Sequence, residues 1–149
     1  MALYETLGNQ DLRASLVADC VKLIDEQVAA KNGISGLALK ATYGVVKGVG
    51  AGYIPGAIDR LLPEVFAALE PMWDEGKQAG DPVAHLTQNR TRTADVLLSV
   101  TDTKIEKTDN GIVRASYNKL RKSVKGDVEE AVPGLAQIIG THATEPVQK

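Results

Sequence analysis

The chain has 149 residues, a formal net charge of −2 and one cysteine, Cys20. This length suits one domain, which can bury a core without disulfides or a structural metal. The small net charge gives the whole molecule no strong attraction to nucleic acid or to an anionic membrane. A single thiol excludes a disulfide framework and any site that needs two thiolates.

Aromatic residues make up 4% of the chain, whereas hydrophobic residues make up 44%. Strands favour aromatic side chains, so a core of Leu, Val, Ile and Ala is more typical of closely packed helices than of a sandwich or barrel. The sequence shows no secretory signal and no apolar run of ~18 residues. We therefore expect a cytoplasmic protein with no helix inserted in a membrane.

The first predicted helix begins at Asn9, a residue type that caps helix N-termini, and continues with apolar residues at three- and four-residue steps. Gly33 is a typical stop signal for it. A second helix is expected from Ser35, with Leu37 and Val45 among its apolar positions, until a run of glycines interrupts it.

A third helical region covers about residues 58–76 and contains Pro63 and Pro71, each of which either kinks a helix or begins a new one. Asp81 and Pro82 have the pattern of a cap followed by a first helical residue. Further helices are expected over the ranges 82–105, 113–125 and 128–139, followed by a frayed tail from residue 141. The predicted fold is all-α: a compact bundle of five to six helices forming one domain over residues 1–143, with a flexible tail over 144–149.

The two halves of the chain resemble each other. Lys40-Ala41-Thr42-Tyr43 matches Arg114-Ala115-Ser116-Tyr117, and Pro63 matches Pro133. This favours a tandem duplication of a three-helix unit, with halves over 9–76 and 82–140 related by a pseudo-twofold axis. The alternative is chance similarity between amphipathic helices. If the duplication holds, four matched residues are candidates for the interface between the halves: Asp19, Tyr43, Asp95 and Tyr117.

Candidate chemistry is sparse. His85 and His142 have no ligand partner at metal-binding spacing, Cys20 lies on an apolar stripe without an identifiable base, and no phosphate-binding loop motif is present. We therefore predict no catalytic, cofactor-binding or metal-binding residue and no cofactor. The glycines at 44, 48, 52 and 56 are read as a helix end with a connector, or as a stripe for close helix packing.

The densest basic run places Arg114, Arg121 and Lys125 close to one face of a predicted helix over 114–125. A solvated helix face is the first interpretation, and a weak contact with an anion or nucleic acid is the alternative. Nucleic acid is a poor candidate because aromatic side chains and excess positive charge are missing.

Three segments carry a resemblance to a known family: Val28-Ala-Ala-Lys-Asn-Gly-Ile-Ser-Gly, Lys40-Ala-Thr-Tyr, and Asp59-Arg-Leu-Leu-Pro. They are similar to an uncharacterised family of small helical bacterial proteins, a domain of unknown function. The resemblance implies an intracellular, helical, stand-alone protein and supplies no activity or site residue.

The leading functional hypothesis is a non-enzymatic protein that acts by protein–protein contact, either as a homo-oligomer, most simply a homodimer, or with an unknown protein partner. The motivation is the large number of Leu-, Val- and Ala-rich helical faces for so small a bundle. A carrier of a small apolar ligand or lipid, with its cavity between the two halves, is the alternative.

Overall fold

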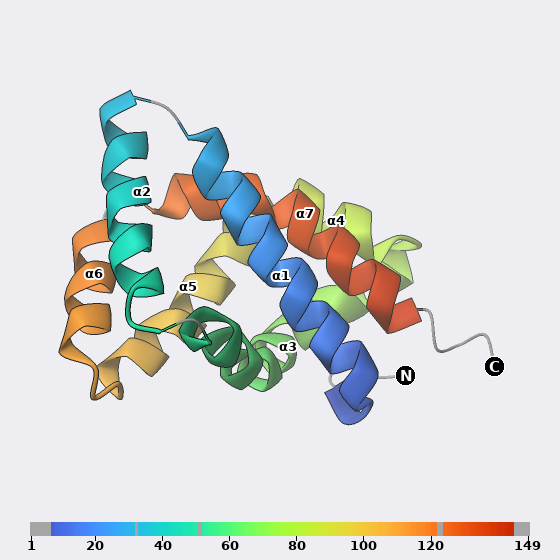
Figure 1. The fold of residues 1–149 in the computed structure, drawn as a ribbon. Helices are drawn as coiled ribbons and strands as arrows, with labels where there is room; N and C mark the ends of the chain where they lie inside the picture. Colours follow the sequence, from blue (N-terminus) through green and yellow to red (C-terminus); the bar gives the residue numbers. More distant parts are fainter. Residues whose placement is uncertain (1–6, 32, 51, 122–123, 145–149) are drawn as a thin grey trace.

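The computed structural model describes residues 7–31, 33–50, 52–121 and 124–144, and across them it is all-helical, with seven helices and no strand (Figure 1). The helices are α1 (Gln10–Ala30), α2 (Gly33–Lys47), α3 (Tyr53–Ala79), α4 (Pro82–Gln88), α5 (Arg90–Glu106), α6 (Gly111–Arg121) and α7 (Lys125–Thr144). The predicted helical class is confirmed. The described residues form seven helices instead of five or six. The predicted frayed tail from residue 141 is wrong as far as residue 144, because α7 continues to Thr144. The rest of the predicted tail, 145–149, lies outside the described residues.

Two predicted helix starts are confirmed. The side chain of Asn9 accepts hydrogen bonds from the backbone N–H groups of Asp11, at 2.9 Å, and Leu12, at 3.1 Å. Asp81 accepts from the N–H of Ala84 at 3.1 Å, directly ahead of Pro82. These side chains satisfy N–H groups that the first turn of a helix leaves without a partner.

Asn89 explains the extra helix. Its backbone, with φ −109° and ψ 40°, leaves the helical region between α4 and α5. Its side-chain Nδ2 donates to the carbonyl of His85 at 2.8 Å, which satisfies a group at the end of α4. Asparagine competes in this way with the backbone of a helix, so the single helix expected from Pro82 is divided in two.

The start of α2 also differs from the expected one, because α2 begins at Gly33 rather than at Ser35.

Pro63 and Pro133 both lie inside continuous helices, α3 and α7, and neither begins one. Pro71 is also internal to α3. A proline in a helix leaves the carbonyl four residues earlier without its normal N–H donor. For Pro63 this carbonyl belongs to Asp59, and the guanidinium of Arg13 on α1 donates to it instead, from Nη2 at 2.8 Å.

The core is centred on α3. This helix contributes buried side chains that pack with residues of α1, α4 and α7: Leu62, Phe66, Leu69, Met72 and Trp73. Gly76 permits the close approach of α4, because a Cβ at this position would overlap the Cα of Pro82. The core therefore joins α3 to the helices that surround it.

Helices α2 and α6 form a separate pair that packs side by side at one end of the molecule (Figure 1). Among the described residues, the main hydrophobic cluster takes no member from either helix. Helix α2 also contacts α1 and α3, and α6 also contacts α5. This pair is consequently held to the body of the protein by something other than the main core.

Candidate functional site

Two tyrosine–aspartate contacts attach the α2–α6 pair to the rest of the protein. Tyr43 of α2 donates its hydroxyl hydrogen to Oδ1 of Asp25 on α1 at 2.6 Å. Tyr117 of α6 donates in the same way to Oδ1 of Asp102 on α5. Burial, followed by the hydrogen bond to aspartate, raises the pKa of Tyr43 above its ordinary value and that of Tyr117 to about 12. Both phenols therefore remain hydrogen-bond donors at neutral pH.

Each of these contacts includes a cation one turn further along the helix. Lys47 places Nζ 3.7 Å from Oδ1 of Asp25. Arg121 binds Asp102 through two hydrogen bonds, Nε to Oδ1 at 2.8 Å and Nη2 to Oδ2 at 3.0 Å. The bond from Arg121, and to a smaller extent that from Tyr117, lowers the pKa of Asp102 against the opposing effect of burial.

The sequence singled out both tyrosines but did not pair them with Asp25 and Asp102. The separations along the chain are 18 residues for Tyr43 and Asp25 and 15 residues for Tyr117 and Asp102, so no common spacing marks the pairs. The sequence made both tyrosines candidates for an interface between the proposed halves. The structure instead turns each hydroxyl toward the preceding helix of its own half.

The predicted basic face is wrong, because α6 ends at Arg121 and Lys125 belongs to α7. Arg121 binds Asp102, and Nζ of Lys125 lies 2.8 Å from Oδ1 of Asp95. Arg114 donates to the carbonyl of Thr108. Two of the three cations thus have carboxylate partners, and the three do not form one anion site.

Asp19 and Asp95 do not form a shared site either. Asp19 contacts Nε2 of His142 at 2.7 Å, whereas Asp95 pairs with Lys125. These two partners stand 17 residues apart at opposite ends of α7, which corresponds to roughly 25 Å along the helix. The Nδ1 atom of His142 is buried and has no hydrogen-bond partner among the described residues.

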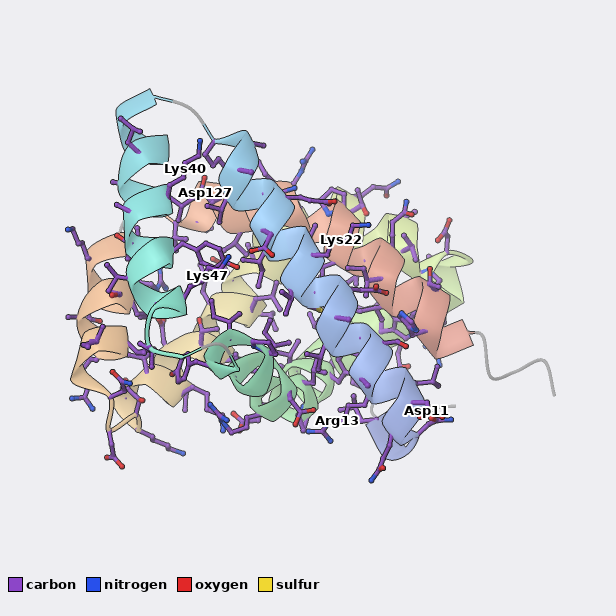
Figure 2. All side chains as sticks on the ribbon, viewed as in Figure 1. Asp11, Arg13, Lys22, Lys40, Lys47 and Asp127 are labelled. Carbon is purple, nitrogen blue, oxygen red and sulfur yellow. The ribbon has the colours of Figure 1, made fainter. Side chains whose placement is uncertain are left out.

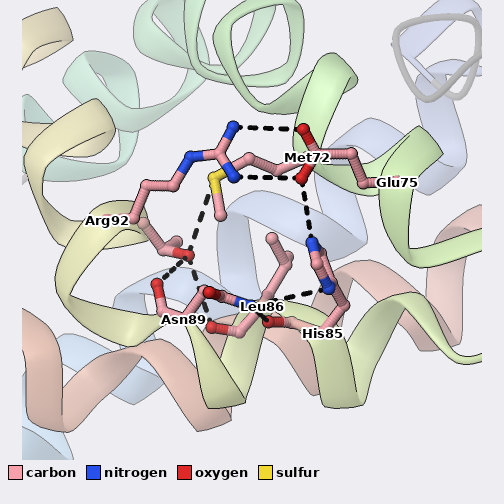
Figure 3. Close-up of polar contacts among 7 residues, drawn as sticks. Met72, Glu75, His85, Leu86, Asn89 and Arg92 are labelled. Carbon is pink, nitrogen blue, oxygen red and sulfur yellow. Dashed lines mark hydrogen bonds and ion pairs between the residues drawn. The ribbon is translucent and has the colours of Figure 1, made fainter. Parts of the chain in front are cut away.

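A network of hydrogen bonds and ion pairs connects α3, α4 and α5 near Asn89, the residue between α4 and α5 (Figure 3). Glu75 receives two hydrogen bonds from Arg92, at 3.0 and 3.2 Å, and its Oε1 lies 3.0 Å from Nε2 of His85. These bonds, led by that of Arg92, hold the pKa of Glu75 below its usual value. The hydroxyl of Thr93 is buried against the carbonyls of Leu86 and Asn89, at 3.3 and 3.0 Å. Each polar group here has a structural partner.

Two clefts in the surface of the described residues are large enough to be compared with ligand sites. One of about 420 Å³ is lined by Leu7, Gly8, Gln10, Arg13, Ala14 and Asp59, and one of about 290 Å³ by Gln27, Ala30, Lys31, Gly36, Leu39, Asp127 and Glu130. Both are open and contain ion pairs, Arg13 with Asp59 and Lys31 with Asp127 and Glu130. Neither cleft is the enclosed apolar chamber that a lipid carrier requires.

The described residues offer neither a metal site nor a membrane-spanning helix. Within the described part of the chain, no group of three His, Cys, Asp or Glu residues is placed to hold a metal ion. No described helix is long and apolar enough to cross a membrane.

The outer side of α2 carries apolar residues that the sequence analysis placed among ordinary packing positions. Leu37 is 68% exposed and Val45 is 53% exposed, and Ile112 on the neighbouring α6 is 56% exposed. Ala41 is also exposed and lies on the same face, because Leu37, Ala41 and Val45 follow one another at four-residue steps. The opposite side of α2 faces inward, with Thr42 only 5% exposed.

The same two helices carry exposed cations. Lys40 and Lys47 leave α2 on the side that faces α1 (Figure 2). Arg114 and Lys119 are exposed on α6. Neither α2 nor α6 contains an acidic residue. We name as the α2–α6 surface the exposed residues Leu37, Ala38, Ala41, Val45 and Ile112 with the exposed cations Lys40, Arg114 and Lys119. It is the candidate functional site.

Comparison with known proteins agrees with the resemblance read from the sequence. The model of a family of unknown function, DUF6918, matches residues 3–143. The match spans nearly the whole chain, so the chain belongs to this family. No curated protein and no solved structure matches it significantly.

Proposed function

We propose that this member of the family acts without catalysis, by protein–protein contact through the α2–α6 surface. The observation that carries the proposal is the exposure of Leu37, Val45 and Ile112 on two adjacent helices. Single exposed aliphatic side chains are common on protein surfaces, but a grouped apolar patch with a polar edge is typical of an interaction site.

Energetics support the same proposal. Burying apolar surface is worth about 25 cal/mol per Å², so covering three large aliphatic side chains contributes several kcal/mol to association. Helix α2 is apolar on its outer side as well, although its inner side already meets α1, α3 and α6. A partner that covers this side would remove the cost of exposing it to water.

The tyrosine–aspartate contacts attach the two helices of the surface to the rest of the protein. Tyr43 joins α2 to α1, and Tyr117 with Arg121 joins α6 to α5. Interaction sites gain affinity when the binding elements are ordered before the partner arrives. In this proposal the contacts of Asp25 and Asp102 hold the two helices in position for binding.

We also propose that the chain is a tandem duplication of a three-helix unit. The matched residues Tyr43 and Tyr117 both donate to an aspartate on the preceding helix, and the matched Pro63 and Pro133 both lie within long helices. In this scheme α1–α3 correspond to α5–α7, and the α2–α6 surface combines one helix from each unit. Self-association, as expected from the sequence, is one form of the proposed contact, and a cytoplasmic location remains a prediction.

The proposal is tested by Ala41→Glu, which places a charge in the middle of the α2–α6 surface. Ala18→Glu is the matched control, because Ala18 is an exposed helical alanine on α1. Sedimentation velocity from about 1 to about 100 µM measures self-association. Fluorescence anisotropy measures binding of a labelled amphipathic helical peptide with a Leu/Ala seam and Gln flanks.

We expect Ala41→Glu to weaken at least one of these associations about tenfold or more, because a buried unpaired charge is costly. Ala18→Glu should behave as the wild type. If Ala41→Glu and Ala18→Glu are indistinguishable in both assays, the proposed function is wrong.

A further inference from the structure

We propose that the occupant of the α2–α6 surface is a single amphipathic helix of another protein whose flanks carry carboxylates. This inference rests on the proposed function and adds the chemistry of the partner to it.

The charge of the chain is unevenly divided. Helices α2 and α6 hold five cations, Lys40, Lys47, Arg114, Lys119 and Arg121, and no acidic residue. All 19 acidic side chains and the remaining 12 cations lie elsewhere in a chain whose net charge is −2. The α2–α6 surface is thus a basic area on an otherwise acidic protein, and an acidic partner is electrostatically complementary to it.

Three of the five cations are available to a partner. Lys47 and Arg121 already face Asp25 and Asp102. Lys40 and Lys119 are exposed and have no carboxylate within ion-pair distance among the described residues, and Arg114 contacts only a carbonyl. Lys40 lies three residues from Leu37 on α2, and Arg114 and Lys119 lie on the helix that packs beside α2, so a helix seated on Leu37, Ala41 and Val45 would have these cations near it.

A second copy of this chain fits the surface poorly. A twofold interface brings the same patch of each copy together, so it would place basic side chains near basic side chains. Helix α2 has 15 residues and is roughly 22 Å long, which is short for the ~800 Å² that each partner of a stable dimer usually buries. A single helix in a shallow groove needs less area.

A membrane surface fits poorly as well. Helices that lie on a bilayer insert long or aromatic side chains into the acyl boundary. The aromatic ring of α2 belongs to Tyr43, whose hydroxyl is turned inward to Asp25. The exposed face instead alternates Leu and Val with small residues, which let the axis of a partner helix approach closely.

Gly44 gives an independent sign of this close approach. It is exposed within α2, and a Cβ at this position would meet no other atom within 4 Å. The packing inside the chain therefore does not require a glycine there, although glycine weakens a helix relative to alanine. A partner helix that comes close at Gly44 would account for it.

The experiment uses the full chain and three labelled helical peptides of about 20 residues that share a Leu/Ala seam and differ in their flanks, which carry Glu, Gln or Lys. We expect the Glu-flanked peptide to bind about tenfold more tightly than the Gln-flanked one, and the Lys-flanked one to bind most weakly. The differences should shrink as salt is raised from about 50 to about 300 mM. Gly44→Ala should weaken binding of the Glu-flanked peptide about threefold or more.

A charge reversal provides the matched control. Lys40→Glu combined with Lys119→Glu should invert the order of the Glu- and Lys-flanked peptides. Lys22→Glu, at an exposed lysine on α1, should leave the order unchanged. Each of these positions is exposed, so the folded state is expected to tolerate all three changes.

The possible outcomes separate this inference from the proposed function. If the Glu- and Lys-flanked peptides bind equally and Ala41→Glu abolishes their binding, the proposal of an acidic partner is wrong. The proposed function in protein–protein contact then still stands. Self-association without peptide binding, again lost in Ala41→Glu, has the same two consequences and identifies a second copy as the occupant. Binding to anionic lipid vesicles, lost in Ala41→Glu and not accompanied by peptide binding or self-association, overturns both.

Discussion

Arg13 of α1 donates a hydrogen bond to the carbonyl of α3 that Pro63 leaves without a backbone donor. Its Nη2 donates to the carbonyl of Asp59 at 2.8 Å, and its Nε donates to Oδ1 of the same residue at 2.6 Å. The carbonyl of Asp59 is the one that residue 63 would bind if it had an N–H group. A side chain of α1 thus supplies the donor for a carbonyl of α3 that has no backbone N–H partner because of Pro63.

This relationship predicts coupling between Arg13 and Pro63. Arg13→Met keeps the aliphatic stem but should reduce the free energy of unfolding by about 1–2 kcal/mol, because the Asp59 carbonyl then lacks a protein donor. In a Pro63→Ala background the new N–H can bind that carbonyl, so the same change should cost less than half as much. Urea unfolding of the four proteins in a double-mutant cycle measures the difference, and additive costs would contradict the assignment.

Tyr43→Phe tests the contact that joins α2 to α1. It removes the hydroxyl that donates to Asp25 while keeping the ring, so we expect a loss of about 1 kcal/mol in the free energy of unfolding. Tyr53→Phe is the matched control, since the hydroxyl of Tyr53 has no hydrogen-bond partner among the described residues, and it should change stability by less than about 0.5 kcal/mol. Equal effects of the two substitutions in urea unfolding would show that the Asp25 contact contributes nothing.

Asp102→Asn should have a pH-dependent effect. The pKa of Asp102 is lowered below its ordinary value in the folded protein, chiefly by the hydrogen bond from Arg121, so the carboxylate stabilises the folded state at every pH above the ordinary pKa of an aspartate. This stabilisation is lost as the pH falls through the lower folded pKa. More than a third of the side chain is exposed, so we expect a modest gap of about 0.5–1 kcal/mol between wild type and variant at neutral pH.

The gap should remain constant down to about pH 5 and shrink below about pH 4. Unfolding by urea at a series of pH values measures it. A gap that widens as the pH falls would have the wrong sign for an aspartate held ionised by Arg121.

Two glycine substitutions should change stability in opposite directions. In Gly76→Ala the new methyl group would overlap Pro82 and lie 3.0 Å from the Cβ of His85, so α3 and α4 must move apart. We expect a loss of about 2–3 kcal/mol. Gly44→Ala meets open space within α2 and should stabilise the chain by about 0.5–1 kcal/mol. Thermal unfolding of both variants measures the contrast, which a shared direction of change would contradict.

Cys20 should be nearly inert in the folded protein. Burial, with a smaller contribution from Asp19, raises the pKa of its thiol from 9.0 to about 11. At pH 8 this lowers the thiolate fraction by roughly two orders of magnitude, and the buried position also blocks access by reagents. A colorimetric disulfide reagent should react slowly with the native protein and rapidly in denaturing urea, whereas fast native reaction would place Cys20 at the surface.

The local features of the fold were predictable from the sequence. Asn9 and Asp81 begin helices as expected because a cap side chain reaches N–H groups two or three residues further along the same chain. The break at Asn89 was missed although it is also local. The sequence predicted one helix over 82–105, whereas the helix is interrupted at Asn89 and the side chain of Thr93 that follows is completely buried.

The candidate site was only partly predictable. Leu37 and Val45 were recognised as apolar positions of a helix, yet the sequence cannot tell which apolar side of α2 meets the body of the protein. Arg114, Arg121 and Lys125 were assigned to one helical face because no signal showed that α6 ends at Arg121. Asp19 and Asp95 were matched in the comparison of the two halves of the sequence, and they bind partners at opposite ends of α7.

The sequence by itself determined the helical class, the starts of α1 and α4 and the match of Tyr43 with Tyr117, since these depend on residues within a few positions of one another or on simple comparison of segments. Only the tertiary structure decided that Tyr43 meets Asp25, that Arg13 serves the carbonyl ahead of Pro63, and that the apolar side of α2 faces outward. The physical reason is that contacts between helices depend on their relative rotation and distance. Successive residues of a helix are rotated by about 100°, so a shift of one position along the helix moves a side chain from the core to solvent.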